Sequence, residues 1–588
     1  MGSSSGGDVV GEILARRGVK ALFTLCGGHT APILTGAKRQ GIRVIDVRDE
    51  KSAVFAADAV ARMTGIPGVA VVTAGPGVTN TVTAVENAKL AESPVVVFGG
   101  SAATLLKGRG ALQDIDQLAI MKPLTKWATT VKTMAQLQAS TERAFEVASS
   151  GVPGPVFIEV PVDLLYPESV VREWYFKESG VEHPRGLGGR ALKLYLQGHL
   201  LKQFRAPRLP EAPWQAGGQA RGEGENGPGV AAAIQRAGSV IRGAERPVLV
   251  VGSQALTARR DAEDIAEAIG ALGMPTYLAG TARGLLGRHS DIQFRHKRGA
   301  ALKEADAVVI AGFPFDFRLG YGRAIGKRAT VIAANLSDRA LSQNRRPEIG
   351  VKTHPGQFLL DLAAETRAGA ATRWSSWFET LRERERERDD EIAAKASPGT
   401  ELVDPIALFR SVEDAMDDDA ILVVDGGDFV ATASYILRPR KPLSWLDPGV
   451  FGTLGVGGGF AVGAAVAGPG REVWLIYGDG SSAYSLAEID TCARHGLAPI
   501  AIVGNDASWA QIAREQVEIL GDDCGTVLAR TDYHRVAEGY GGVGLLLDDP
   551  AKIDEVLREA KNAARGGAPV VINVHLAATD FRKGSISI

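Results

Sequence analysis

The stretch Val473-Trp-Leu-Ile-Tyr-Gly-Asp-Gly-Ser481 decides the fold class, because an apolar run of strand length ends in a glycine-rich acidic turn. The same arrangement returns in Ile500-Ala-Ile-Val-Gly-Asn-Asp506, after an intervening helical pattern. A strand–helix–strand unit of this kind places both polar turns at one edge of a parallel sheet. Asp479 and Asp506 at one edge indicate a site for a hard cation such as Mg²⁺. The glycine turn before a helix also favours phosphate binding.

The bulk composition bounds the class of protein. A chain of 588 residues is too long for one hydrophobic core, so we expect several domains. A net charge of −2 predicts no broad attraction to nucleic acid or to acidic membranes. The three cysteines are widely separated and show neither zinc spacing nor a disulfide framework, which predicts a cytoplasmic protein. We expect no signal peptide and no membrane-spanning helix, since no run of about 18 apolar residues occurs.

Apolar runs alternate with helical patterns in three blocks, which cover residues 1–170, 230–375 and 404–588. This alternation predicts three α/β domains with parallel sheets. Residues 376–403 are predicted to form a linker helix between the second and third blocks.

Residues 171–229 interrupt the alternation between the first and second blocks. Their second half is rich in Pro and Gly and is typical of a linker. Residues 191–205 predict a basic amphipathic helix. That helix either packs on its own protein or contacts a membrane surface or a partner.

Several motifs in this order resemble those of the thiamine diphosphate (ThDP) enzymes. The pair Gly478-Asp479-Gly480 and Asn505-Asp506 looks like the GDG…NN motif of that family, and the other motifs cover nearly the whole chain outside residues 170–230. They are Asp49-Glu50 at the start of a helix, Thr73-Ala-Gly-Pro-Gly-Val-Thr-Asn80, Pro153-Gly-Pro-Val-Phe-Ile-Glu-Val-Pro-Val-Asp163 and Gly452-Thr-Leu-Gly-Val-Gly457. The resemblance implies three flavodoxin-like, doubly wound α/β domains: pyrimidine-binding, central and diphosphate-binding.

Within this family the chain resembles the acetolactate synthase-like subgroup associated with 2-hydroxyacyl-CoA lyase activity. The motifs that carry this are Phe23-Thr-Leu-Cys-Gly-Gly-His29, Arg109-Gly-Ala-Leu-Gln113, Val424-Asp-Gly-Gly-Asp-Phe429 and Trp445-Leu-Asp-Pro-Gly449. The resemblance implies cleavage of a 2-hydroxyacyl-CoA to an aldehyde and formyl-CoA, or the reverse condensation. Acetolactate synthesis from pyruvate, oxalyl-CoA decarboxylation and a non-catalytic ThDP-binding regulator are the alternatives. The presence of Glu50, Leu454 and Asp479 argues against the regulator.

The resemblance assigns the pyrimidine end of the cofactor to Glu50, Pro76, Gly452 and Leu454. Glu50 is expected to share a proton with the aminopyrimidine, which requires an apolar pocket that raises its pKa. The bulky Leu454 is expected to hold the cofactor bent, so that its amino group lies near the reacting carbon.

At the diphosphate end the resemblance implies contacts from Gly427, Asp428 and Phe429 and from the GDG turn. The turn contributes Gly478, Asp479, Gly480 and Ser481. The family often has Gly-Gln-His where this chain has Gly-Asp-Phe, which removes the usual phosphate donors. Asp479, Asp506 and the Ser508 carbonyl are the expected Mg²⁺ ligands, with Asn505 as the alternative to Asp506.

On the substrate side, Gly28, His29 and Gln113 match positions near the reacting centre in relatives. His29 is expected to donate to the substrate oxygen or to take a hydroxyl proton, or else to cap its own loop. In the central block, Arg283 and Arg318 lie in segments resembling those that bind FAD or an ADP group in relatives, or that retain a vestigial site. Glu50 and the GDG turn belong to different domains. In relatives these two segments meet across a dimer interface, so a homodimer or homotetramer is implied.

Overall fold

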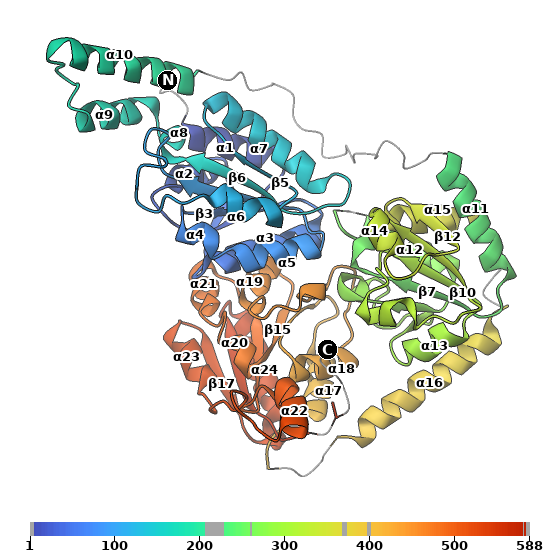
Figure 1. Cartoon of the computed structure of the whole chain (residues 1–588). Helices are drawn as coiled ribbons and strands as arrows, with labels where there is room; N and C mark the ends of the chain where they lie inside the picture. Colours follow the sequence, from blue (N-terminus) through green and yellow to red (C-terminus); the bar gives the residue numbers. More distant parts are fainter. Residues whose placement is uncertain are drawn as a thin grey trace. The chain divides into compact units, whose positions relative to one another are not determined.

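The computed structural model describes residues 5–205, 228–258, 261–366, 373–396, 401–579 and 581–583 (Figure 1). It divides into two compact units. The first contains the described residues up to 205 except 62–65, and the second contains 62–65 and the described residues from 228 onward. The predicted Pro- and Gly-rich linker lies outside the described residues, except for its last two residues, 228 and 229.

The first unit contains one six-stranded parallel sheet. Its order is β2 (Arg43–Asp46), β1 (Ala21–Leu25), β3 (Gly68–Val72), β4 (Val95–Ser101), β6 (Val156–Pro161) and β5 (Trp127–Thr130). The central strands β3 and β4 are wholly buried, as expected for continuous apolar runs covered on both faces. The edge strand β5 was not predicted, because it is short and only half-buried.

Helices cover both faces of this sheet (Figure 1). One face carries α1 (Gly6–Arg16), α2 (Ala31–Arg39) and α7 (Met134–Ser149), and the other carries α3 (Glu50–Thr64) and α5 (Val82–Leu90). The short helices α4 (Pro76–Thr79), α6 (Gln117–Met121) and α8 (Val162–Leu165) follow strands or turns. Right-handed crossovers explain this arrangement. The order of the strands reverses direction at β2, so the connecting helices before and after β2 lie on opposite faces of the sheet.

The insertion forms two helices in the first unit, α9 (Glu168–Glu178) and α10 (Gly186–Gln203). One face of α10 is buried through Leu196, Leu200 and Gln203. The other exposes Leu187 and Leu194, so packing on its own protein accounts for only part of the helix. Across the described residues, no helix is both long and apolar enough to cross a membrane.

The central sheet of the second unit is also parallel. Its order is β12 (Ile349–Lys352), β11 (Thr330–Asn335), β10 (Ala307–Ala311), β7 (Pro247–Val251), β8 (Thr276–Leu278) and β9 (Gln293–Phe294). Its helices are α11 (Pro228–Gly243), α12 (Ala262–Leu272), α13 (Arg298–Glu304), α14 (Asp338–Ser342), α15 (Pro355–Thr366) and α16 (Ser375–Ala394). The predicted linker helix is α16, and its first turns bury Trp377 and Phe378 in the central core. Residues 397–400 of the predicted linker lie outside the described residues.

The C-terminal sheet repeats the strand order of the first sheet. It contains β14 (Trp445–Leu446), β13 (Ile421–Asp425), β15 (Val473–Gly478), β16 (Ile500–Asn505), β18 (Val570–His575) and β17 (Val543–Leu547). Its helices are α17 (Pro405–Ala415), α18 (Asp428–Ile436), α19 (Gly457–Ala467), α20 (Asp479–Ser482), α21 (Glu488–His495), α22 (Ala510–Leu520), α23 (Tyr533–Gly539) and α24 (Ile553–Arg565).

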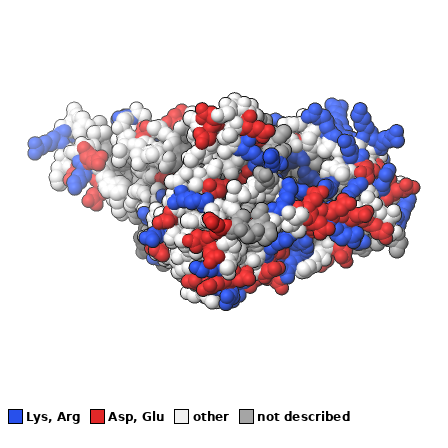
Figure 2. Space-filling view, turned by 90° about the horizontal axis from the view of Figure 1, so that it is seen from below, with Lys and Arg blue, Asp and Glu red and all other residues white. Residues whose placement is uncertain are grey.

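The three parallel sheets confirm the predicted α/β class with three doubly wound domains. The central sheet differs in detail, because numbering its own strands from one gives the order 3-2-1-4-5-6 rather than the flavodoxin-like order. Acidic and basic side chains are interspersed on the face shown in Figure 2, which agrees with the small net charge of −2.

Candidate active site

In the first unit, one turn collects most of the residues predicted to contact the cofactor ring and the substrate. The turn is residues 73–80, and it leads from β3 into α4. Thr73 Oγ1 lies 3.3 Å from His29 Nδ1. A methyl group on Gly75 would lie 2.7 Å from the Gln113 carbonyl oxygen, so the segment around Gln113 packs directly on the turn. Pro76 itself is exposed.

Glu50 is the first residue of α3 and is buried at 6 % exposure. Asn80 donates a hydrogen bond to its Oε2 over 3.0 Å. A methyl group on Gly77 would lie 3.4 Å from Oε1, and this glycine therefore leaves space beside the second oxygen. Within the part of the chain that the structure describes, Oε1 accepts no hydrogen bond, so it is available to a ligand. Sequence reasoning did not identify Asn80 as a partner of Glu50.

His29 and Gly28 lie in the loop after β1. Burial lowers the pKa of His29, so its imidazole is neutral near pH 7 and has one donor and one acceptor nitrogen. Gly28 is exposed, and its carbonyl accepts a hydrogen bond from Tyr166 Oη at 3.3 Å. Gln113 has a φ of 60°, a left-handed conformation that is uncommon for a side-chain-bearing residue.

A buried hydrogen-bond chain stabilises the same turn from behind. Gly75 N donates to Gln117 Oε1 over 2.7 Å, and Gln117 Nε2 donates to Glu159 Oε1 over 2.9 Å. Glu159 is fully buried and forms an ion pair with Lys107. Sequence reasoning missed Gln117 and Glu159, since they lie far from the turn in sequence.

In the second unit, the GDG turn and the Asn-Asp turn lie side by side at the ends of β15 and β16. Ser508 N donates to Asp479 Oδ2 at 3.3 Å and to Asp506 Oδ1 at 3.2 Å. Burial, and then the Asp479 carboxylate, raise the pKa of Asp506 to about 7. Burial also raises the pKa of Asp479. Two carboxylates that disfavour each other's charge form a place where a cation is stabilising.

Asn505 occupies a different environment from Asp506. Its amide nitrogen donates to the Thr531 carbonyl at 3.1 Å and to Asn573 Oδ1 at 3.2 Å, and the residue is fully buried. The Ala507 carbonyl accepts the N–H of Leu528 at 2.8 Å. Among the described residues, no backbone N–H bonds to the Ser508 carbonyl.

Gly480 of the GDG turn lies against a bulky neighbour. A methyl group on Gly480 would lie 2.5 Å from the indole ring of Trp509, so a larger residue would require this ring to shift. Gly478 N–H lies beside the turn after β13, where Ser481 Oγ donates to the Asp425 carbonyl at 2.6 Å. The structure therefore brings Gly478, Asp479, Gly480, Ser481 and Asp506 together.

The side chains of Asp428 and Phe429, in the loop at residues 427–429, have partners within the protein. Asp428 forms an ion pair with Arg514 on α22. Phe429 is buried at 8 % exposure, packs on Phe409 with ring centroids 4.6 Å apart, and covers Gly504. The aromatic ring therefore belongs to the core, and the expected contact of Gly427, Asp428 and Phe429 with the diphosphate stays a prediction.

Asp425 is an unpredicted member of this site. It ends β13, is fully buried, and accepts hydrogen bonds from Gly455 N at 3.0 Å and Gly457 N at 2.8 Å. Burial raises its pKa to about 7. These bonds fix the loop that carries Gly452 and the half-buried Leu454, whose predicted roles at the pyrimidine remain predictions.

The two arginines predicted to meet a nucleotide in the central domain have partners within the protein. Arg283 stacks on Trp445 at 4.6 Å from the ring centroid. Arg318 pairs with Asp316 at 2.6 Å and stacks on Phe313. The contacts of these residues give the predicted ADP or FAD site no support.

Comparison with known proteins agrees with this geometry. The family model of the thiamine pyrophosphate enzyme N-terminal TPP binding domain matches residues 4–120, the central domain matches 234–362, and the C-terminal TPP binding domain matches 425–574. The chain is thus a thiamine pyrophosphate enzyme, a name equivalent to ThDP enzyme.

Full-length relatives narrow the class. The chain is 45 % identical to 2-hydroxyacyl-CoA lyase 2 of Danio rerio over 99 % of this chain and 93 % of that protein. It is 44 % identical to 2-hydroxyacyl-CoA lyase 2 of Homo sapiens over 99 % and 92 %. A probable acetolactate synthase of Mycobacterium bovis is 31 % identical over 96 % and 95 %. The chain belongs to the ThDP-dependent acetolactate synthase-like family, as a lyase similar to the 2-hydroxyacyl-CoA lyases.

Proposed function

We propose that the protein cleaves 2-hydroxyacyl-CoA to an aldehyde and formyl-CoA, with ThDP and Mg²⁺ as its cofactors. The observation that carries this proposal is the buried Glu50, with one oxygen bound by Asn80 and the other available beside Gly77. Relatives named 2-hydroxyacyl-CoA lyase 2 at 45 % and 44 % identity, against 31 % for a probable acetolactate synthase, support the substrate class.

The acidic pair of the second unit fits a hard cation. No group of three or more His, Cys, Asp or Glu side chains in the described parts of the chain lies close enough to hold a metal. Mg²⁺ often takes one or two carboxylates and completes its shell with phosphate oxygens and water. Asp479, Asp506 and the Ser508 carbonyl are therefore the ligands we propose. The environment of Asn505, bonded to Thr531 and Asn573, favours Asp506 over it.

The residues of this chain bind, position and move protons. When bound, ThDP supplies the nucleophile and the electron sink. The free Glu50 oxygen would hold a proton at the pyrimidine, and Leu454 would support the bent cofactor. The backbone N–H groups of the GDG turn would receive the diphosphate. The neutral His29 would accept the proton of the substrate 2-hydroxyl group.

The net reaction balances without a further reactant. The bond between C1 and C2 of the acyl group breaks, and the hydroxyl-bearing C2 becomes the aldehyde carbon. The hydroxyl group loses its proton, and C1 gains a proton. C1 then leaves as formyl-CoA. Condensation of formyl-CoA with an aldehyde is the same reaction reversed.

We also propose that the protein is a cytoplasmic homodimer or homotetramer. The three cysteines are free, of which Cys492 is buried, and this supports a reducing compartment. The exposed leucines of α10 leave contact with a membrane surface or a partner as the less favoured alternative.

The decisive experiment supplies the purified enzyme, with ThDP and Mg²⁺, with a 2-hydroxyacyl-CoA, with oxalyl-CoA and with pyruvate in separate assays. We expect an aldehyde and formyl-CoA in equal amounts from the first, identified by mass spectrometry. Acetolactate from pyruvate as the main product would replace this proposal with the acetolactate synthase activity. Turnover of oxalyl-CoA alone would assign decarboxylation.

A further inference from the structure

A cavity of about 270 Å³ lies in the first unit, and residues 73–80 are not among those that line it. It opens where β4, β5 and β6 end, and α10 of the insertion forms its other side. Most of its surface is apolar, and basic residues are among those that line it. The lining residues are Thr104, Lys107, Thr130, Lys132, Thr133, Pro161, His199, Lys202 and Gln203.

Three lysines and no carboxylate line this cavity. Lys107 is paired with Glu159 behind the wall. Lys132 and Lys202 form no ion pair with any residue that the structure describes. The second carboxylate behind the wall, Asp163, already accepts hydrogen bonds from Thr104, Tyr175 and Gln203. The two free ammonium groups therefore give the cavity a net positive character, which favours an anion.

The cavity also contains the start of a long helix. Thr133 is the N-cap of α7, and its hydroxyl accepts the N–H of Gln136. The positive end of the helix dipole therefore adds to the two lysine charges. This contribution is secondary to the lysines, but it has the same sign.

A second kind of group belongs to a residue that lines the cavity, namely a buried acceptor without a donor. Gln203 is 1 % exposed, and its Nε2 donates to Asp163 Oδ2 over 2.7 Å. Because a carboxylate only accepts, this bond fixes the orientation of the amide. Gln203 Oε1 is buried and has no hydrogen-bond partner. A buried, unpaired carbonyl is costly unless a ligand or water donates to it.

His199 adds a second acceptor. The Thr104 hydroxyl donates its only hydrogen to Asp163 Oδ2, so His199 Nε2, 3.0 Å away, must donate to the Thr104 oxygen. Burial lowers the pKa of His199, so the ring is neutral and Nδ1 is an acceptor.

From this combination we propose that the cavity binds a small organic anion that also carries a hydroxyl group. Lys132 and Lys202 bind the phosphate or carboxylate group, and Gln203 Oε1 accepts the hydroxyl hydrogen. A volume of about 270 Å³ suits a metabolite smaller than a nucleotide, since drug-sized ligands occupy roughly 300–1,000 Å³.

The ligand would act on the turn at residues 73–80 through Lys107, Thr130 and Glu159. Lys107 and Thr130 line the cavity, and both bind Glu159. Glu159 in turn holds Gln117, which accepts the N–H of Gly75. An anion that draws Lys107 away from Glu159 therefore alters the support of the turn beside Glu50. The cavity is in this sense an effector site rather than part of the substrate site.

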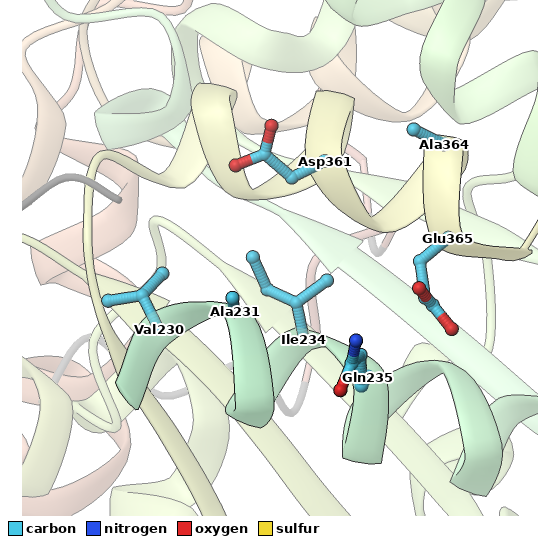
Figure 3. A pocket seen from close by; sticks show the side chains of 7 residues that line it. All are labelled: Val230, Ala231, Ile234, Gln235, Asp361, Ala364 and Glu365. Atoms are coloured by element: carbon cyan, nitrogen blue, oxygen red, sulfur yellow. The ribbon is translucent and has the colours of Figure 1, made fainter. Parts of the chain in front are cut away.

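A second cavity in the central domain has the opposite character (Figure 3). It is a groove of about 360 Å³ between α11 and α15, and Asp361 and Glu365 line it. Glu365 pairs with Arg242, and Asp361 accepts from Gln357. Both carboxylates of this groove therefore have partners within the protein.

The test measures binding to the enzyme saturated with ThDP and Mg²⁺, so that the diphosphate turn is occupied. Glycerol 3-phosphate, inorganic phosphate and glycerol are titrated separately by calorimetry. We expect glycerol 3-phosphate to bind more tightly than phosphate and glycerol not to bind. Combined Lys132→Ala and Lys202→Ala substitutions should weaken the binding of both anions at least ~10-fold.

The matched control combines Lys177→Ala with Lys193→Ala, which removes the same charge from α9 and α10 outside the cavity. This control should bind both anions as the unmodified enzyme does. Gln203→Leu should abolish only the advantage of glycerol 3-phosphate over phosphate. Equal binding by the cavity variant and its control, or no saturable binding to the unmodified enzyme, would overturn the proposal. If the Gln203 variant fails to fold, the comparison of the Lys132 and Lys202 variant with its control decides the outcome.

Discussion

The two oxygens of the Glu50 carboxylate have different surroundings, and this asymmetry suits a proton-sharing role. Oε2 is held by Asn80, which fixes the orientation of the carboxylate. Oε1 lies where Gly77 leaves room. A solvated surface glutamate would have neither the burial nor the fixed orientation.

Replacing Glu50 by Gln should therefore abolish most turnover while leaving the cofactor bound. The amide keeps the size of the side chain and a hydrogen bond with Asn80, but it cannot share a proton. We expect kcat to fall about 100-fold or more, with the ThDP dissociation constant changed only a few-fold. Steady-state kinetics and calorimetric titration of ThDP check the two parts.

The matched control is Asp49→Asn, one residue earlier, where the side chain caps α3 and pairs with Lys51. This variant should retain activity. Full activity of Glu50→Gln would refute the proposed role of Glu50.

The metal ligand can be assigned by comparing two adjacent residues. Asp506→Ala should raise the Mg²⁺ concentration needed for ThDP binding about tenfold or more, because a carboxylate ligand is lost. Asn505→Ala should lower thermal stability instead, since it removes the bonds to Thr531 and Asn573. Metal titrations and melting curves distinguish these effects. The reverse pattern would assign the ligand to Asn505.

At the scale of single residues, the sequence predicted those that stand in family motifs, such as Glu50 and Asp479. It did not predict Asn80, Gln117 or Asp425 as their partners. Each of these forms hydrogen bonds to residues 30 or more positions away, as in the contact of Asn80 with Glu50. No local pattern marks such a pair, because the fold alone brings the two together.

Among the elements, β13 shows how a strand end positions a distant loop. Asp425 closes this strand and holds Gly455 and Gly457 by their N–H groups, so the loop expected to contact the cofactor pyrimidine is tied to the sheet. The carboxylate is buried without a cationic partner among the described residues, and its charged form is therefore costly.

This burial predicts a stability that falls as pH rises. The folded pKa of Asp425 is about 7 and its ordinary value is 3.8, so the folded state binds the proton more tightly. The stabilisation of the folded state by this tighter proton binding amounts to roughly 4 kcal/mol. It is fully present below pH ~4 and is lost between pH ~4 and ~7. Asp425→Asn keeps an acceptor for both N–H groups without the charge. Melting temperatures of the cofactor-free protein at pH 5 and 8 should differ less for this variant.

The opposite result would count against this account. An equal loss of melting temperature between pH 5 and pH 8 in both proteins would show that Asp425 does not titrate with folding. Asp428→Asn is the control, since its carboxylate pairs with Arg514.

Twelve of the 18 strands were predicted to within three residues at each end, because continuous apolar runs are strong signals. The strands β5, β8, β9, β12, β14 and β17 were missed. Most of them are short, and β14 has only two residues, Trp445 and Leu446. A short strand is held by its neighbour rather than by its own pattern, so its position depends on the finished sheet.

For the whole molecule, exposed apolar side chains gather on elements near the diphosphate turn. Ile512, Val517, Ile519 and Leu520 on α22 are all exposed. A cluster of this kind on one helix is typical of an interaction surface. It supports the proposed self-association, since a lone chain would leave these side chains in water.

We therefore expect the purified protein to have two or four times the chain mass of 61.8 kDa in light scattering. The mass should be the same with and without ThDP if the contacts are made mainly by protein surfaces. A mass of one chain at the concentrations used for the activity assay would contradict the proposed dimer or tetramer.

The indole of Trp509 fills the space that the missing Gly480 side chain leaves open, and it adjoins the shared amide of Ser508. This gives the enzyme a built-in optical reporter. Indole emission responds to nearby charge and to water, so we expect the proposed binding of cation and diphosphate to change it without a label. Trp509→Phe would remove this signal. The substitution would thereby separate the emission of Trp509 from that of the other seven among the 8 tryptophans of the chain.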